Sequence, residues 1–425
     1  AVGLLLLTIA GVLASPLLIT IFAPGFSATP QKAHLAADLL RITFPYLLFI
    51  ALTALAGSIL NTLGHFLTPA LTPIFLNIAM IAASLFLTPY VEEPITALAI
   101  GVLIGGVLQL SLQIIPLWKK GYLPHPKIAL QHPEVRRVMG LMSPALFGAS
   151  ITQINLLINT FLASLLTTGS ISWLYYADRL LEFPLGLLGV ALGTVILPQL
   201  ARSRSEGKQE AFSETLAWAL RTLLLIGLPA TLGLVCLAEP LMFTLFQHDQ
   251  FHAEDARMAA RSLVAYGAGL PAFLALKVLV PAFSAEEDLR TPARIGIYAV
   301  GVNLLVSLVS TFLLAPPGWG HAGLALAASI AASFNAVVLW LILKSRGHLP
   351  TSRGNRRFTA QLVLANAILA TVLIMAQADL HFEGLATSTR IETLAALILG
   401  GAFVYLATLL IAGVRPRHLL EPGPH

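Results

Sequence analysis

The sequence has little charge and almost no cysteine. Only 11% of its 425 residues are Asp, Glu, Lys or Arg, whereas soluble domains carry roughly 25%, and this excludes a soluble globular protein. The single cysteine, Cys236, excludes an intramolecular disulfide and is expected to be a buried bystander in an apolar run. Hydrolase nucleophile, metalloprotease, Walker-lysine and zinc-ligand motifs are all missing. The sequence therefore predicts no catalytic residues, no metal and no cofactor.

Hydrophobic residues dominate the composition of the chain. They make up 57% of the chain, with a mean hydropathy of +0.84, and they form continuous runs of about 20 residues, the length that spans a bilayer as a helix. The sequence predicts an all-α polytopic membrane protein. Twelve apolar segments are expected, at about residues 1–23, 38–62, 68–89, 95–117, 138–166, 183–201, 215–238, 258–283, 293–315, 321–344, 358–377 and 390–413.

The basic residues are distributed unevenly between the connecting loops. Most of the 25 Lys and Arg residues follow even-numbered segments or lie in the C-terminal tail. Because basic loops stay on the cytoplasmic side, these loops and the C-terminus are expected to be cytoplasmic. The same distribution accounts for the net charge of +5, so nucleic acid is not an expected partner.

The chain contains an internal repeat. LASPLLITIF (13–22) resembles LAEPLMFTLF (237–246). Equivalent pairs follow at matching spacing: Arg41 with Arg261, and Tyr46 with Tyr266. A repeat offset by six segments keeps the same orientation, which predicts two parallel-repeat lobes.

The repeat also predicts the domain organisation. We expect an N-lobe of four helices at residues 1–118, a cytoplasmic loop at 119–137, a six-helix C-lobe at 138–345, and two extra helices with a basic tail at 346–425. The first lobe then lacks two helices, which would precede Ala1, and the chain has no initiator Met.

The stretch from Ser170 to Leu200 carries the charges that invite a functional interpretation. Asp178, Arg179 and Glu182 lie at the mouth of an apolar run, where charge in a membrane protein is costly. On a helix, Asp178 and Glu182 share a face and Arg179 reaches Glu182. The alternative is a self-satisfied ion cluster at the end of a helix.

Further polar residues lie inside other segments. Lys277 is near the middle of the eighth segment, and a cavity-facing ammonium is favoured there. A net basic cavity that attracts an anionic substrate is expected from these charges together with Arg41 and Arg261. Gln153 and Asn159 give the fifth segment a polar seam, which either faces the cavity or holds helices together.

Several stretches resemble one family. SWLYYADRLLEFPLGLLGVALGTVILPQL (172–200), FPYLLFIALTALAGSILNT (44–62), APGF (23–26) and GVLQL (106–110) are similar to the MurJ/MviN family of bacterial lipid II flippases. That family belongs to the multidrug/oligosaccharidyl-lipid/polysaccharide exporter superfamily. The resemblance implies fourteen helices, two six-helix lobes plus two, which agrees with twelve here and two beforehand.

The resemblance implies movement of lipid II, an undecaprenyl-pyrophosphoryl disaccharide-pentapeptide, from the cytoplasmic to the periplasmic leaflet of the bacterial inner membrane by alternating access. It places Asp178, Arg179 and Glu182 in the central cavity, with lipid II and the bilayer as partners, a monovalent ion as a possible coupling partner, and no enzyme activity. Three alternatives stay open: an exporter of another lipid-linked polysaccharide or drug, a membrane scaffold, and a lipid-pyrophosphate enzyme.

Overall fold

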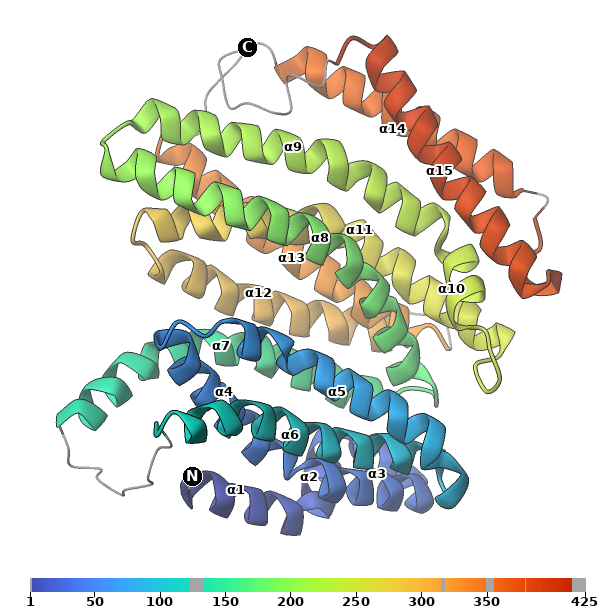
Figure 1. Ribbon diagram of the computed structural model, residues 1–425. Helices are drawn as coiled ribbons and strands as arrows, with labels where there is room; N and C mark the ends of the chain where they lie inside the picture. The colour runs from blue at the N-terminus through green and yellow to red at the C-terminus, as the bar shows by residue number, and fades with distance from the viewer. Residues whose placement is uncertain (1, 123–132, 315–317, 349–354, 379, 415–425) are drawn as a thin grey trace. The chain divides into compact units, whose positions relative to one another are not determined.

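The chain is helical almost throughout its described part (Figure 1). The computed structural model describes residues 2–122, 133–314, 318–348, 355–378 and 380–414, and these contain no β-strand. Among them, nine helices are long and apolar enough to cross a membrane, or ten if the bent pair α1 and α2 forms one span. The predicted all-α membrane fold is confirmed. The described residues of each predicted apolar segment lie in one helix or in two consecutive ones, apart from a few residues at helix ends. The count of twelve spans stays a prediction.

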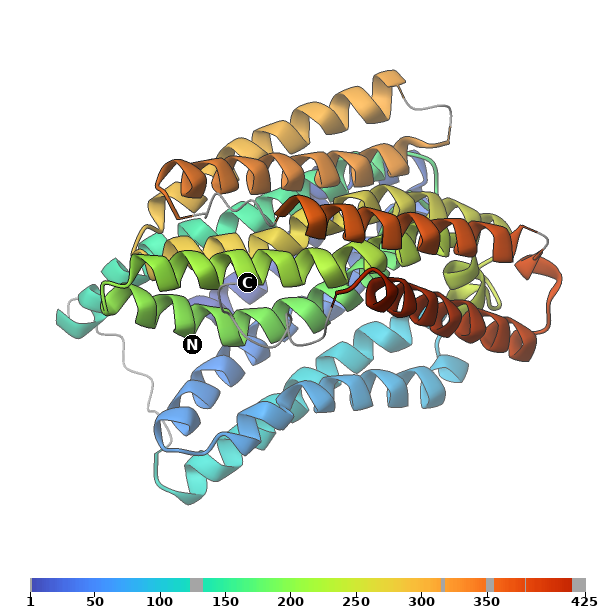
Figure 2. The ribbon, with the colours of Figure 1, turned by 90° about the horizontal axis from the view of Figure 1, so that it is seen from above.

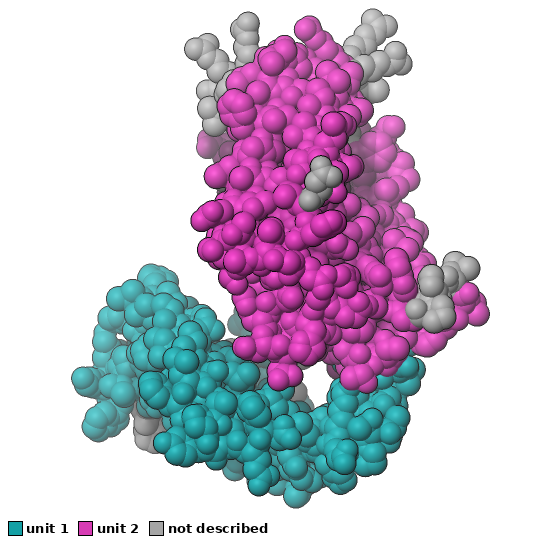
Figure 3. Space-filling view, turned by 90° about the vertical axis from the view of Figure 1, so that its right-hand side faces the viewer, with its two compact units in different colours: residues 1–146, 160–165 teal, residues 147–159, 166–425 magenta. Residues whose placement is uncertain are grey.

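The chain divides into two compact units, coloured separately in Figure 3. Unit 1 comprises residues 1–146 and 160–165, and unit 2 comprises residues 147–159 and 166–425. Unit 1 holds α1 (Val2–Leu13), α2 (Ser15–Phe22), η1 (Pro24–Ala28), α3 (Pro30–Thr43), α4 (Tyr46–Thr62), α5 (Leu67–Phe86), η2 (Thr88–Tyr90) and α6 (Pro94–Lys119). Helix α7 (Pro133–Ser164) contributes to both units.

Unit 2 holds α8 (Ser170–Ser205), α9 (Gln209–Cys236), α10 (Ala238–Phe246), α11 (Ala253–Ala285), α12 (Arg290–Leu308), η3 (Val309–Leu314), α13 (Gly320–Ser345), α14 (Asn355–Gln377), η4 (Phe382–Gly384) and α15 (Thr387–Ile411). The predicted loop at 119–137 lies partly outside the described residues.

In unit 1, glycines allow α6 to approach α5 closely. A Cβ atom on Gly101 would lie 2.8 Å from the Ala83 Cβ and 3.1 Å from the Met80 Cα. A Cβ on Gly105 would lie 2.7 Å from the Leu76 side chain. Small residues permit this contact between membrane helices, where dispersion contributes more than the exclusion of water.

The repeated sequence forms the same local structure twice. Helix α1 ends at Leu13, and α2, which begins two residues later, runs at 73° to it, with Pro16 in its first turn. In the second copy, α9 ends at Cys236 and the short helix α10 follows, with Pro240 in its first turn. Because proline lacks an N–H, it is well tolerated in the first turn of a helix, where that N–H would have no intrahelical partner.

In unit 2, α11 is the central helix and packs along α8, α9 and α13. Buried leucine, alanine and phenylalanine side chains form its core. The last two helices, α14 and α15, lie side by side (Figures 1 and 2). They are tied to the unit by side chains that donate to carbonyls: the Tyr405 hydroxyl to Leu225 at 2.6 Å, Gln377 to Cys236 at 3.0 Å and Arg390 to Phe243 at 3.1 Å.

Candidate functional site

Helix α8 has one buried face and one charged face. Trp173, Ala177 and Leu181 are 7%, 0% and 2% exposed and follow one another at intervals of four residues, so they form one stripe against the core of unit 2. Arg179 and Glu182 lie on the exposed side. The stretch predicted from the sequence therefore presents its charges away from the core.

The charges on this face interact locally. The Arg179 Nη1 lies 2.7 Å from the Glu182 Oε2, and the side chains are 49% and 53% exposed. The Arg179 guanidinium also stacks over the Tyr175 ring, 4.9 Å from its centroid. Asp178 is half-buried and forms no hydrogen bond or ion pair with a described residue. The contact expected at i, i+3 is present.

Lys277 of α11 joins the same face of α8. It is exposed, and a Cβ atom on Gly189 would lie 3.3 Å from its Cγ, so its stem packs against that glycine. Gly189 follows Glu182 by seven residues, or two helical turns, which places it on the same stripe about 10 Å further along. No hydrogen bond or ion pair joins Lys277 to a described residue. Asp178, Arg179 and Glu182 on α8, with Lys277 packed against Gly189 two turns further along, are called the α8 charged face below.

The other predicted site residues lie on α3, α7 and α11. Arg41 belongs to unit 1, where its Nη1 pairs with the Asp38 Oδ1 at 2.6 Å. Arg261 stacks over Trp319 at 4.1 Å and lies about 24 Å from Lys277 along α11. On α7, Gln153 is exposed and Asn159 is half-buried, with no hydrogen-bond partner for its Oδ1 in the described part of the chain. Within unit 2, no described hydrogen bond or ion pair joins Arg261, Gln153 or Asn159 to the α8 charged face.

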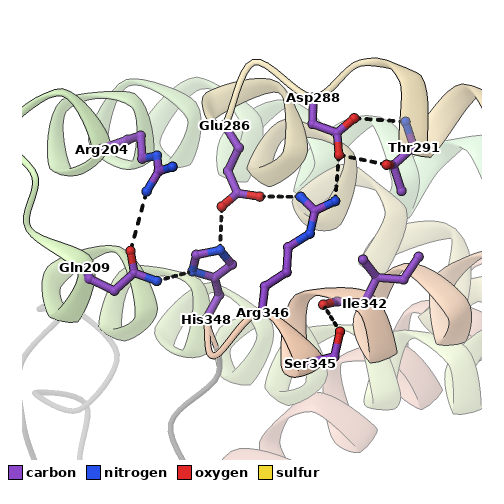
Figure 4. A network of polar contacts seen from close by, with 9 residues as sticks. All are labelled: Arg204, Gln209, Glu286, Asp288, Thr291, Ile342, Ser345, Arg346 and His348. Atoms are coloured by element: carbon purple, nitrogen blue, oxygen red, sulfur yellow. Dashed lines mark hydrogen bonds and ion pairs between the residues drawn. The ribbon is translucent and has the colours of Figure 1, made fainter.

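A second polar cluster joins the ends of four helices of unit 2 (Figure 4). Arg346, after α13, reaches both Glu286 at 2.8 Å and Asp288 at 2.7 Å, which lie between α11 and α12. His348 contacts the buried carboxylate of Glu286 and, at 2.7 Å, the side-chain amide of Gln209 at the start of α9. The cluster fixes one end of the unit by pairing its charges.

These contacts change the acidity of the loop carboxylates. The hydrogen bonds from Arg346 and then from Thr291, at the start of α12, lower the pKa of Asp288 to about 2, from 3.8. Hydrogen bonds from Arg202 and Lys208 lower the pKa of Glu206 to about 2 in the same way. Both carboxylates are ionised at any physiological pH.

The sequence reasoning missed two sets of contacts in unit 2. One is the cluster of Figure 4. The other joins Trp173 of α8 to Asp255 of α11 at 2.8 Å. Asp255 lies in the first turn of α11 and accepts this bond. Only the acidic first turn, a signal for the start of a helix, pointed to Asp255 beforehand.

The fold defines the class: a multi-pass α-helical membrane protein with internally repeated helices, as in secondary transporters. The profile of the family described as "Lipid II flippase MurJ" matches residues 1–391, and the chain belongs to this family of transporters. The probable lipid II flippase MurJ of Vibrio cholerae is 42% identical over 97% of this chain and 79% of its own length. The lipid II flippase MurJ of Burkholderia cenocepacia is 39% identical over 97% of this chain and 80% of its own length. A solved structure of a lipid II flippase MurJ in an inward closed conformation covers 96% of this chain and 81% of its own, with a TM-score of 0.79 and 28% identity.

Proposed function

We propose that this protein is a lipid II flippase, which moves the lipid-linked peptidoglycan precursor from the cytoplasmic to the periplasmic leaflet for cell-wall synthesis. The observation that carries the proposal is similarity over nearly the whole chain, in profile, sequence and structure, to proteins that bear this name. The repeated helix break, before α2 in one copy and before α10 in the other, supports movement by alternating access between two repeats.

The α8 charged face supplies groups that suit the head of such a lipid. The substrate's pyrophosphate is anionic, so Lys277 attracts it as a point charge and Arg179 binds its oxygens in pairs. The Arg179–Glu182 pair is half exposed, and exchanging a carboxylate for a phosphate partner there costs little. Asp178 and Glu182 are suited to the sugar hydroxyls and to coupling the head group to lobe movement.

The function is tested in a wall-forming bacterium whose own lipid II flippase can be depleted. The full chain, expressed from a plasmid, is expected to restore growth and to restore the access of an externally added lipid II-cleaving enzyme to its substrate. Failure to restore either, with the protein present in the membrane, contradicts the function. Accumulation of a different lipid-linked oligosaccharide on depletion would instead favour another exporter of the superfamily.

The site is tested by Arg179→Ala in the same strain. Lipid II export is expected to fall at least about tenfold, the effect of losing one charge-assisted contact. Arg202→Ala is the matched control, because Arg202 forms a similar exposed pair with Glu206 outside the charged face. Normal growth and export by Arg179→Ala would show that the site is assigned wrongly.

The driving force and the orientation are part of the proposal. The sequence has no nucleotide-binding motif, so the membrane potential or a monovalent-ion gradient is the proposed source of energy. Ionophores that collapse the potential or one ion gradient at a time distinguish these sources. A cytoplasmic C-terminus is proposed, and the basic loops that follow even-numbered segments support it.

A further inference from the structure

Trp173 lies at the start of α8, one turn before the charged face, and is held from three sides. Its indole Nε1 donates to the Asp255 Oδ1 of α11 at 2.8 Å. Its ring meets the ring of His321 of α13 edge to face, with the centroids 4.9 Å apart. Its third neighbour is the backbone of Gly169, just before α8.

Gly169 is required by both the backbone and the ring. Its φ of +103° lies in the left-handed region that glycine tolerates. A Cβ atom there would lie 2.5 Å from the Trp173 ring, closer than any real contact. The indole therefore folds back over the chain that leads into α8, and no other residue at position 169 leaves it room.

The partners of Trp173 are themselves fixed. The second carboxylate oxygen of Asp255 accepts the backbone N–H of His252 at 2.9 Å and so caps α11. His321 is fully buried, and its Nδ1 lies 2.7 Å from the Ser262 Oγ. An indole N–H that bonds a carboxylate, itself anchored by a helix cap, is a strong and directional contact.

We propose that Trp173 and Asp255 are positioning residues, which fix the rotation of α8 about its axis and thereby hold the α8 charged face outward. The proposal rests on the proposed function for the role of that face. Ala177 and Asp178 are neighbours, separated by about 100° around the helix. Ala177 is fully buried, so a rotation of that size turns Asp178 toward the core and moves Arg179 and Glu182 away from their present direction.

The rotation is measured with nitroxide spin labels on the exposed side of α8. Phe183 and Leu187 are 74% and 65% exposed, so a label at either position, in a Cys236→Ala background of the full chain, is expected to be mobile. In Trp173→Phe, which keeps the ring and removes the donor, the ratio of immobilised to mobile label is expected to rise about tenfold. Trp340→Phe is the matched control, since Trp340 lies on α13 and is 37% exposed.

A second pair of variants protects the test against misfolding. Asp255→Ala removes the acceptor, whereas Asp255→Asn keeps one oxygen for the indole. The immobilised fraction and the loss of lipid II export are expected to be largest for Asp255→Ala and smaller for Asp255→Asn, at equal amounts of monodisperse protein. A purely structural role would lower the yield of all variants without this order and without a change in the spectra.

The outcomes separate this inference from the proposed function. Unchanged spectra in Trp173→Phe and Asp255→Ala would overturn the positioning role, and so would changed spectra with parental export. If the parent chain does not export lipid II, the proposed function fails, and the spectra alone decide whether Trp173 and Asp255 fix the rotation of α8.

Discussion

At the scale of single residues, the charge of Lys277 can be removed without changing the packing of its side-chain stem. Its stem contacts Gly189, while its ammonium has no partner among the described residues. Lys277→Met keeps a long unbranched stem and removes the charge. We expect Lys277→Met to fold normally and to export lipid II more slowly, because the attraction for the anionic head is lost.

The measurement for Lys277→Met is export in the depletion strain together with the melting temperature in detergent. Lys344→Met is the control, since Lys344 is also exposed and stacks over Trp340 at the end of α13. Equal export by the two variants would remove Lys277 from the site.

A second residue-scale prediction concerns acid stability and Arg346. The folded-state pKa of Asp288 is about 2, below its value in the unfolded chain. Its ion pair therefore stabilises the fold fully above about pH 4, and this contribution is lost as the pH falls through 2. Arg346→Ala removes the partner, so the variant is expected to melt roughly 2–4 °C lower than the parent at neutral pH.

The difference between Arg346→Ala and the parent is expected to shrink as the pH falls from 4 towards 2. Thermal unfolding in detergent across this range is the measurement. Arg294→Ala removes the same charge from an exposed position on α12 and should show no such trend. A difference that stays constant with pH would mean that Asp288 is not the linked group.

At the scale of elements, close helix packing depends on particular glycines. Gly101→Ala places a Cβ 2.8 Å from the Ala83 side chain and 3.1 Å from the backbone of α5, so the helices must separate. We expect a loss of about 1–3 kcal/mol from this overpacking. Gly301→Ala on α12, where a Cβ meets nothing within 4 Å, should be neutral or slightly stabilising because alanine favours helix.

The free energy of unfolding in mixed micelles is the measurement for these glycine variants. If Gly101→Ala is as stable as Gly301→Ala, α5 and α6 can move apart with no loss in the free energy of unfolding, and the prediction is wrong.

The elements also show what a single sequence can and cannot predict. The helices follow from apolar runs of bilayer length, and the Arg179–Glu182 contact follows from a spacing of three residues. The Trp173–Asp255 bond joins residues 82 apart in the chain, and the Gln209–His348 contact joins residues 139 apart. Nothing in local periodicity encodes such pairs, because they depend on how whole helices pack.

The contacts of the predicted site residues also depend on how whole helices pack. Lys277 was expected to face a cavity at mid-helix. Its contact with Gly189 could not be predicted, because it depends on how α8 and α11 pack together. Arg41 and Arg261 are equivalent in the repeat, yet one pairs with an acid and the other stacks on Trp319. Equivalent positions in a repeat keep the backbone more closely than they keep the partners.

At the scale of the whole molecule, the distribution of basic residues predicts one orientation in the membrane. The last turn of α8 carries Arg202 and Arg204, and Lys208 follows in the loop to α9. Basic residues at such a helix end and loop remain on the cytoplasmic side. The loop between α10 and α11, which contains Asp249, is then periplasmic, because one membrane crossing separates the two loops.

Reporter fusions check this orientation. Alkaline phosphatase, which is active only in the periplasm, should be active when inserted after Asp249 and inactive when fused to the C-terminus. A fluorescent protein that folds only in the cytoplasm should show the opposite pattern. The acidic residues near Asp249 contribute little to orientation, so replacing Arg202, Arg204 and Lys208 with Gln should weaken the preference, whereas replacing Glu254 and Asp255 with the corresponding amides should not. Phosphatase activity at the C-terminus of the unmodified chain would reverse the orientation and, with it, the direction of transport proposed for the α8 charged face.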